Sequence, residues 1–275
     1  MSPDRVCGTR AFLIDHGWIN FNLEVYHLMR VPEFVRRFYF RFFGSYKRQW
    51  DLWARNPVAA RVAIAPGART SEIFDESGKE VAAKLLHHIG ANDRILEVGC
   101  GMGRVLKHLA PHCLEAHGVD VSPRMVALAR KHCAGSPRIF IQRCNGSDLS
   151  NLSNSHFDMV FCIYVLQHLE REHAVQYLWE MARVLKEGGV LICEVPNLLF
   201  PRNLETYLTG CRKSRHFSIA RSRFYTPDEI RAVVNGIGFE VVTCAVDSEV
   251  FWVARKNTAV KLSPQNIFES QTIEK

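Results

Sequence analysis

The sequence predicts an α/β protein in which helices cover a mainly parallel β-sheet, with a helical extension before the sheet and a polar tail after it. Residues 77–256 alternate short apolar runs with helical patterns, which is typical of a parallel sheet. The turn ILEVGCGMG at 95–103 joins an apolar strand to a helix. The last two strands are too close in sequence for a crossover helix, so they must pair antiparallel. We therefore divide the chain into an extension (1–76), a sheet domain (77–256) and a tail (257–275).

The first half of the domain should hold three helices and three strands in alternation. Ser122-Pro123 marks the start of the third helix, because serine caps a helix and proline fits its first position. The helices are expected at 78–89, 104–109 and 122–131, and the strands at 94–98, 116–119 and 139–142.

The second half should contain a strand at 157–163, a helix over 178–185 and a strand at 190–195. Glu187-Gly188-Gly189 is expected to end that helix. Thr226-Pro227-Asp228-Glu229 forms a capping box, which should start a helix that ends at 236–238. Two strands at 239–244 and 249–254 follow, and the short link between them predicts a hairpin.

Composition limits the function classes. The 275 residues are 47% hydrophobic and 23% charged, which is ordinary for a globular protein. No apolar run approaches the roughly 20 residues that span a bilayer, and the N-terminus MSPDRVCGTR does not resemble a secretion signal. Nine scattered cysteines fit reduced thiols, so we expect a cytoplasmic protein. The net charge of +7 is compatible with nucleic acid, an anionic membrane, an acidic substrate or solubility alone.

The glycine turn does not match loops that bind phosphate. Its glycines are Gly99, Gly101 and Gly103. A dinucleotide fingerprint needs GxGxxG, and Arg104 stands where that pattern requires its third glycine. Glu97 precedes the first glycine and would repel a pyrophosphate. No GK[ST] follows, which excludes a P-loop.

A ligand with a cationic end and no phosphate suits the turn better. S-adenosylmethionine has a sulfonium, an ammonium, a ribose diol and an adenine. Glu97 can balance its positive charge, and Asp120, which ends the next strand in GVDVS, can accept both ribose hydroxyls. The alternative is a plain strand-to-helix turn, which leaves the register of Glu97, the glycines and Asp120 unexplained.

Four motifs in order resemble those of class I S-adenosylmethionine-dependent methyltransferases, over roughly residues 77–256. LEVGCGMGR is similar to their first motif, GVDVSPRMVALAR to the segment after it, FDMVFCIYVLQHL to the fourth-strand motif, and RVLKEGGVLICEVP to the helix, turn and fifth strand. The LQHL motif resembles the bacterial small-molecule type. The resemblance implies a Rossmann-like, doubly wound sheet of seven strands whose last strand is antiparallel, which agrees with the hairpin.

The resemblance also implies which residues bind the cofactor. Asp120 would bind the ribose, with Val121 and Met125 beside the adenine. Asn145 and Gly146 take the position that contacts the adenine amino group, and Asp148 is the alternative. The remaining expected cofactor residues are Glu97, Gly99, Cys100, Gly101 and Gly103 at the methionine end, and Cys162 in the fourth-strand motif.

Methyl transfer asks little of catalytic side chains, because the sulfonium is already a strong leaving group. A hydroxyl acceptor usually needs a base as well, whereas an amine or thiolate needs positioning. His168 is the leading candidate for a base. Its alternative role is to pack at a helix start and order the loop, and we favour this role because the family motif often has a histidine there whatever the acceptor. Glu194 and Asn197 are weaker candidates.

Two absences limit the chemistry. The [ND]PPY pattern of methyltransferases that act on planar amino groups is missing, with IYVL in its place. A bound metal is not expected either. No carboxylate cluster with metal-ligand spacing follows the fourth strand, and the twelve histidines are dispersed.

Two added segments are expected to select the substrate. Residues 198–225 are basic and carry Tyr207, His216 and Tyr225, and they form either a lid or a mobile surface insertion. Residues 32–50 place basic side chains on one side of a helix and aromatic ones on the other. This helix either contacts an anionic membrane at its inner face or, as we favour, packs on protein, in this chain or a dimer. Residues 53–65 resemble the segment that helps to close the cofactor site in the bacterial enzymes.

The sequence thus predicts a methyltransferase that converts S-adenosylmethionine to S-adenosylhomocysteine and methylates a small molecule on oxygen: a sugar, a glycolipid or a secondary metabolite. An RNA methyltransferase is the main alternative, supported by the charge and the basic-aromatic stretches. No RNA-binding motif accompanies them, so nucleic acid is not the expected partner. A cofactor-binding protein without transferase activity is the third possibility. The oligomeric state does not follow from the sequence.

Overall fold

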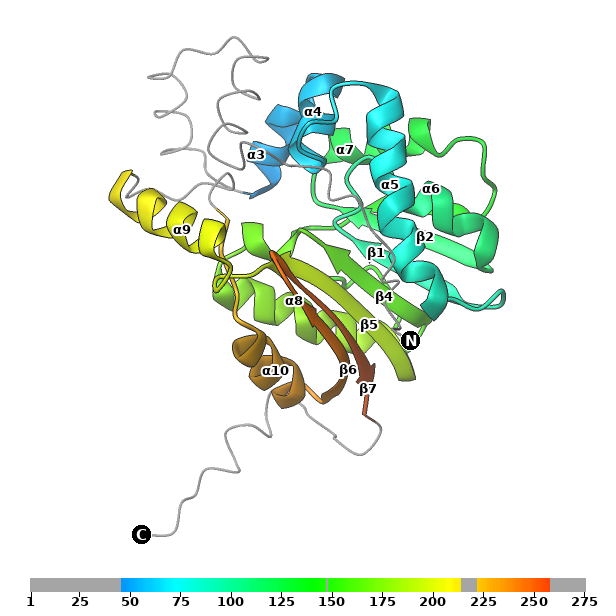
Figure 1. Ribbon diagram of the computed structural model, residues 1–275. Coiled ribbons are helices and arrows are strands. Elements are labelled where there is room, and N and C mark those ends of the chain that lie inside the picture. The colour runs from blue at the N-terminus through cyan, green and yellow to red at the C-terminus, as the bar shows by residue number, and fades with distance from the viewer. Residues whose placement is uncertain (1–45, 147, 214–221, 258–275) are drawn as a thin grey trace, which may run out of the picture.

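A seven-stranded sheet forms the centre of the computed structural model, which describes residues 46–146, 148–213 and 222–257 (Figure 1). The strand order is β3-β2-β1-β4-β5-β7-β6. Neighbouring strands among the first five pair in parallel, and β7 pairs antiparallel with both β5 and β6. The predicted fold with an antiparallel last strand is therefore confirmed. The strands are β1 (Arg94–Val98), β2 (Glu115–Asp120), β3 (Ile139–Arg143), β4 (Phe157–Ile163), β5 (Leu185–Pro196), β6 (Phe239–Val246) and β7 (Glu249–Lys256).

Helices cover both faces of the sheet, as a doubly wound fold requires. On one face, Ile95, Met159 and Phe161 pack under α5 (Ser71–Leu85), α6 (Leu106–Leu109) and α7 (Pro123–His132). On the other face, Leu96 and Trp252 pack under α8 (Arg171–Val184) and α10 (Pro227–Gly236). Three short 3-10 turns complete this part: η1 (Leu86–His88), η2 (Ala110–His112) and η3 (Leu166–His168).

The predicted helix starts with capping residues are confirmed. The Ser122 hydroxyl accepts a hydrogen bond from the Met125 amide at 3.2 Å, and the Thr226 hydroxyl accepts one from the Glu229 amide at 3.2 Å. Each bond satisfies an amide that the helix itself leaves without a partner, so these two helices begin where the sequence indicates.

Several predicted boundaries were wrong, among them the start of the helix expected over 178–185, which begins at Arg171 as α8. Helix α5 begins at Ser71, after the Thr70 cap, and so crosses the expected division between residues 76 and 77. Gly78 therefore lies inside this helix and does not mark its start. A Cβ at this position would come within 2.3 Å of the Arg104 carbonyl oxygen, so the glycine permits close packing. Helix α8 ends at Val184, and the Glu187-Gly188-Gly189 sequence lies within β5, at an irregularity in its pairing with β4.

The described part of the extension lies over the carboxyl ends of the strands (Figure 1). It forms α3 (Tyr46–Trp53) and α4 (Pro57–Ile64). Most of the predicted basic-aromatic helix at 32–50 lies outside the described residues, and its last five residues belong to α3. Of the insertion at 198–225, the structure describes α9 (Pro201–Lys213) and residues 222–225, while His216 lies outside the described residues.

Two further features concern the described residues only. None of their helices combines the length and the hydropathy needed to cross a bilayer. Of their eight cysteines, six are buried.

Candidate functional site

The amide groups of the glycine turn donate to the end of the neighbouring strand. The Val119 carbonyl accepts from the amides of Gly99 and Cys100, at 2.8 and 3.0 Å. The Asp120 carboxylate accepts from the Gly101 amide at 3.0 Å. Phosphate-binding loops direct such amides at the ligand. Here β2 occupies three of them, which supports a ligand without a phosphate.

Asp120 is buried beneath the turn, with 8% of its surface exposed. Its Oδ2 holds the Gly101 amide, and its Oδ1 accepts from the Ser122 amide at 2.8 Å. Burial raises the pKa of this carboxyl to about 6, against the opposing effect of these hydrogen bonds. Each carboxylate oxygen can accept a second hydrogen bond. Asp120 can therefore shape the turn and still bind two hydroxyl groups.

Glu97 is buried on the same side of the sheet as α5 and α6, and its Oε2 has no hydrogen-bond partner among the described residues. Burial raises its pKa to about 8, although the nearby Arg104 guanidinium opposes the shift. A buried acceptor without a donor is costly, and such atoms in native proteins often await a ligand. An ammonium or sulfonium group beside Glu97 would favour its charged form, so this residue fits the cationic end of S-adenosylmethionine.

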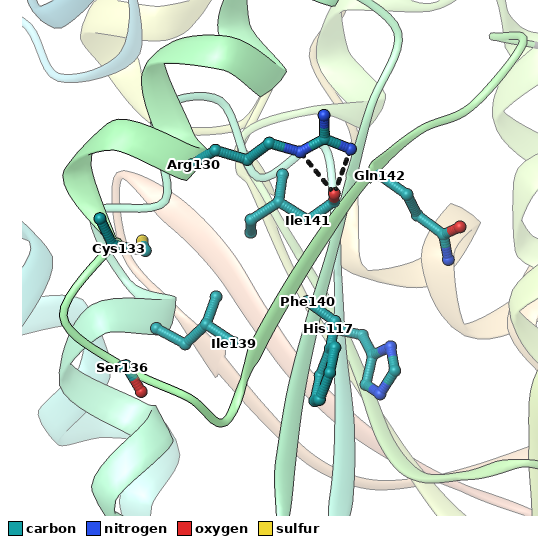
Figure 2. Close-up of a pocket in the computed structure, with 9 residues that line it drawn as sticks. His117, Arg130, Cys133, Ser136, Ile139, Phe140, Ile141 and Gln142 are labelled. Atoms are coloured by element: carbon teal, nitrogen blue, oxygen red, sulfur yellow. Dashed lines mark hydrogen bonds between the residues drawn. The ribbon is translucent and has the colours of Figure 1, made fainter.

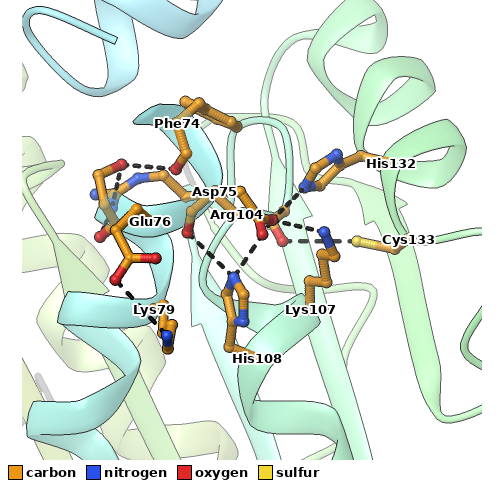
Figure 3. A network of polar contacts seen from close by, with 11 residues as sticks. Phe74, Asp75, Glu76, Lys79, Arg104, Lys107, His108, His132 and Cys133 are labelled. Atoms are coloured by element: carbon orange, nitrogen blue, oxygen red, sulfur yellow. Dashed lines mark hydrogen bonds and ion pairs between the residues drawn. The ribbon is translucent and has the colours of Figure 1, made fainter. Parts of the chain in front are cut away.

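A polar network fixes the far side of the turn (Figure 3). Arg104 donates to the Ser77 carbonyl of α5 at 2.7 Å. Asp75, also on α5, pairs with Lys107 of α6 at 2.6 Å, and its carbonyl oxygen lies 3.2 Å from Nε2 of His108. Arg104, which stands where a dinucleotide-binding fingerprint has its third glycine, thus connects the turn to α5.

The adenine side is built from the segments after β2 and β3. Met125 is buried, with 1% exposed, and a Cβ at Gly146 would lie 2.6 Å from Val121 Cγ2. The Asn145 side chain accepts from the Asp148 amide at 2.9 Å, so these two residues share one turn. The structure therefore places Val121 against Gly146, and Asn145 already shapes the loop after β3.

The thiols of the two cysteines in the expected cofactor set pack in the hydrophobic core. Cys100 is 3% exposed and its sulfur lies against Gly118 of β2. Cys162 is fully buried on β4, opposite Cys193 of β5. Burial raises the pKa of the Cys100 thiol well above its ordinary value, so this thiol stays protonated.

His168 ends η3, and the residue is 5% exposed. The ring meets Trp50 of α3 edge to face, with centroids 5.2 Å apart. The hydroxyl of Tyr46, also on α3, accepts from the Glu170 amide at 2.7 Å. The loop after β4 is thus held under the extension, an arrangement that suits the ordering role.

The other two candidates near the carboxyl end of β5 are engaged in packing. Glu194 is buried, with 3% of its side chain exposed, and its Oε1 pairs with Lys84 of α5 at 2.8 Å. The amide group of Asn197 donates to the Asp247 carbonyl at 2.8 Å and accepts from the Leu199 amide at 3.0 Å. Both side chains connect β5 to neighbouring elements.

Three residues near the site carry features that the sequence did not reveal. Tyr164, directly after β4, has φ of 56°, a strained value for a bulky residue. Gln167 is fully buried, and both polar atoms of its side chain lack a hydrogen-bond partner within the part of the chain that the structure describes. Burial first, and then Glu194, raises the pKa of Glu249 to about 8. Gln167 belongs to the LQHL motif, so its polarity in an apolar run was the available signal.

Comparisons with known proteins agree with this geometry. The family described as "Methyltransferase domain" matches residues 95–189. A ubiquinone biosynthesis O-methyltransferase of Cereibacter sphaeroides is 28% identical over 180 residues, which cover 63% of this chain and 69% of the relative. A demethylmenaquinone methyltransferase of Tropheryma whipplei is 31% identical over 125 residues, 45% of this chain and 50% of the relative.

Solved structures share the fold. Magnesium protoporphyrin IX methyltransferase from Synechocystis, solved with bound S-adenosylhomocysteine, has a TM-score of 0.56 at 18% identity and covers 82% of this chain and all of its own. A putative methyltransferase in a complex with the Trm112 activator of Haloferax volcanii has a TM-score of 0.59 at 18% identity, over 76% of this chain and 98% of that one. The family match falls on the glycine turn and the strands that follow it, so residues 95–189 form a methyltransferase domain of the class I, S-adenosylmethionine-dependent type.

Proposed function

We propose that this enzyme methylates an oxygen atom of a small molecule that carries both a hydroxyl group and an apolar part. The O-methyltransferase activity named for the Cereibacter relative supports oxygen as the acceptor atom. Among the acceptors that the sequence suggests, a glycolipid or an apolar secondary metabolite then fits better than a free sugar.

An apolar cavity of about 480 Å³ is the observation that carries this choice. Its volume is in the range of small-molecule sites. Leu166 follows β4 and Val195 lies near the end of β5, so the cavity reaches the strand ends at which ligands of such sheets bind. Most of its other lining side chains are apolar and come from α8, α10 and β7, among them Ala174, Val175, Leu178, Ile230, Val233, Val234 and Trp252.

The cavity also offers a few polar groups, which would orient a ligand. The indole nitrogen of Trp252 is buried without an acceptor among the described residues. Arg171 forms an ion pair with Glu229 and lies 4.2 Å from the centre of the Tyr225 ring. An apolar tail with a polar head would satisfy both kinds of lining.

For the cofactor we propose the residues gathered at the glycine turn. Glu97 would balance the positive charge of the methionine end, and Asp120 would bind the ribose hydroxyls. When bound, S-adenosylmethionine supplies a methyl group on a sulfonium that is ready to leave. The protein then has to align the acceptor oxygen behind that methyl group, exclude water and let the hydroxyl proton depart. His168 would order the loop after β4, beside which the acceptor would bind.

Calorimetric titration with S-adenosylmethionine, S-adenosylhomocysteine and NAD tests the cofactor assignment. We expect binding of the first two and none of NAD. Binding of NAD alone, or of no nucleotide, would contradict the assignment of the cofactor and with it the proposed function.

Labelled methyl transfer tests the acceptor. The panel pairs a phenol with the same phenol bearing an alkyl tail, a glycolipid with its free sugar, and adds RNA. We expect a lower KM for the tailed member of each pair. Val175→Trp, which fills the cavity, should remove that advantage, whereas Val242→Trp at an exposed position of β6 should not. Equal KM values within each pair would overturn the choice of acceptor, labelled RNA would favour the RNA alternative, and cofactor binding without transfer to any acceptor would favour a non-catalytic protein.

Contact with a membrane through residues 32–50 is a separate proposal, which rests on the basic and aromatic residues of that segment. Sedimentation with anionic and with neutral vesicles tests it. Arg36→Glu together with Arg37→Glu should release the protein from anionic vesicles, and no binding by the unaltered chain would refute the idea.

A further inference from the structure

Three side chains that can bind a metal converge near the amino-terminal ends of strands β2 and β4. Glu115 and His117 lie on β2 and point to the same face, and His156 directly precedes β4. One ligand atom from each of the three lies within 4.8 Å of the others. Strand β1 separates β2 from β4, so the sheet itself brings together residues that are far apart in sequence.

Aromatic contacts hold the two imidazoles in place. His117 stacks on Phe140 of β3, with centroids 4.9 Å apart and an interplanar angle of 25°. Phe157 meets His117 edge to face at 5.2 Å and His156 at 4.9 Å. The two rings therefore flank one phenylalanine with little freedom to turn, which is the preorganisation that a metal site needs.

The carboxylate is held as well. Glu115 Oε2 lies 3.0 Å from His117 Nε2 and accepts from Arg94 Nε at 3.2 Å. Metal-binding carboxylates are commonly supported by such an outer hydrogen bond. The positive groups near His156 are Arg94 and Lys186, and each is paired with a carboxylate, Arg94 with Glu115 and Lys186 with Asp158.

Of the three candidate ligands, His117 lines a cavity of about 600 Å³ at the edge strand β3 (Figure 2). His117 and Phe140 stand side by side at this cavity (Figure 2), and Phe140 is 45% exposed. All three candidate ligands are partly buried.

We propose that Glu115, His117 and His156 bind one divalent transition-metal ion, with Zn²⁺ the best match. Two imidazoles and one carboxylate are ligands that Zn²⁺ accepts, with water in the remaining position. Glu115 starts β2 and Asp120 ends it, so at about 3.3 Å per residue the site lies roughly 17 Å along the strand from the ribose-binding carboxylate. The ion would therefore take no part in methyl transfer, and it would join β2 to the start of β4 across β1.

Metal titration of the full-length chain tests the proposal, after treatment with a chelator. Zn²⁺ is titrated by calorimetry, and Co²⁺ serves as a probe because its visible absorption reports the coordination. We expect one ion per chain, a spectrum of four-coordinate Co²⁺, and a higher Tm with Zn²⁺. His156→Ala should weaken binding at least about tenfold and remove the Tm shift. His112→Ala, at an exposed histidine of η2, should change neither.

Glu115→Gln guards against a variant that fails to fold, since it keeps the shape of the side chain and weakens it as a ligand. Loss of the Tm shift in both variants, with each still folded without metal, supports the site. Binding by the unaltered chain that survives His156→Ala would show adventitious contact with other histidines. Either that result or the absence of stoichiometric binding would overturn the proposal, and neither depends on methyl transfer.

Discussion

Ile64, the last residue of α4, lies directly over Gly101 of the glycine turn. A Cβ at position 101 would come within 2.7 Å of Ile64 Cδ1, and Gly101 has φ of 52°, which favours glycine. The extension thus fits onto the turn where only glycine leaves room. Cofactor binding and docking of the extension should therefore depend on the same residue.

Gly101→Ala should weaken binding of S-adenosylhomocysteine at least about tenfold, because the new methyl group strains the turn and displaces α4. Calorimetry measures the affinity, and limited proteolysis between α3 and α5 reports the docking of the extension. Gly135→Ala is the matched control, since nothing lies within 4 Å of a Cβ there. Equal affinities for the two variants would show that the contact is unimportant.

Asp120→Ala should weaken binding of S-adenosylhomocysteine by about 1–3 kcal/mol, roughly 5- to 150-fold. The change removes the expected partner of the ribose hydroxyls and also the acceptor for the Gly101 amide. Asp228→Asn, at an exposed position on α10, controls for the loss of a negative charge. An unchanged Kd for the Asp120 variant in calorimetry would rule out the ribose assignment.

The parts of this fold that follow from local sequence were predictable. Ser122 and Thr226 mark helix starts because each caps its own helix, and the short link after β6 requires a hairpin. From the sequence, Glu194 was predicted only as a weak candidate for a catalytic base. Its burial depends on Lys84, which is 110 residues away in sequence and reaches it through the packing of α5 on the sheet.

Spacing alone also hides contacts between strands. Glu115 and His117 lie far in sequence from His156, and only the insertion of β1 between β2 and β4 places the three together. Dispersed histidines therefore predicted no metal. Gly78 misled the prediction of the start of α5 for a similar reason, because its close contact with Arg104 is tertiary.

Glu249→Gln should stabilise the protein increasingly as pH rises. The pKa of Glu249 is about 8 in the folded chain against 4.5 for the free group, because of burial and the nearby Glu194, with Lys84 opposing and Asp247 adding to the shift. A raised carboxyl pKa contributes stability below the unfolded value, and this contribution is lost as pH rises through the folded one. The neutral amide avoids that loss.

Urea unfolding of the unaltered chain and the Glu249 variant at about pH 5 and about pH 8 measures the difference. The gain from Glu249→Gln should be larger at the higher pH. Glu240→Gln, at an exposed position on β6, should show no such trend. A gain that is the same at both pH values would mean that Glu249 is charged in the folded protein.

His168→Phe separates the two roles of that histidine. A ring at this position can keep the edge-to-face contact with Trp50, but it cannot take a proton. If His168 orders the loop, the phenylalanine variant should keep kcat within a few-fold and retain its Tm, while His168→Ala lowers both Tm and kcat. General base catalysis typically raises the rate about 10²- to 10⁴-fold. If His168 is the base, kcat should fall by that factor in both variants. Methyl-transfer kinetics with an active acceptor, together with cofactor affinity, decide between these outcomes. A loss of kcat in the phenylalanine variant at unchanged cofactor affinity and Tm would reverse the assignment and make His168 the base.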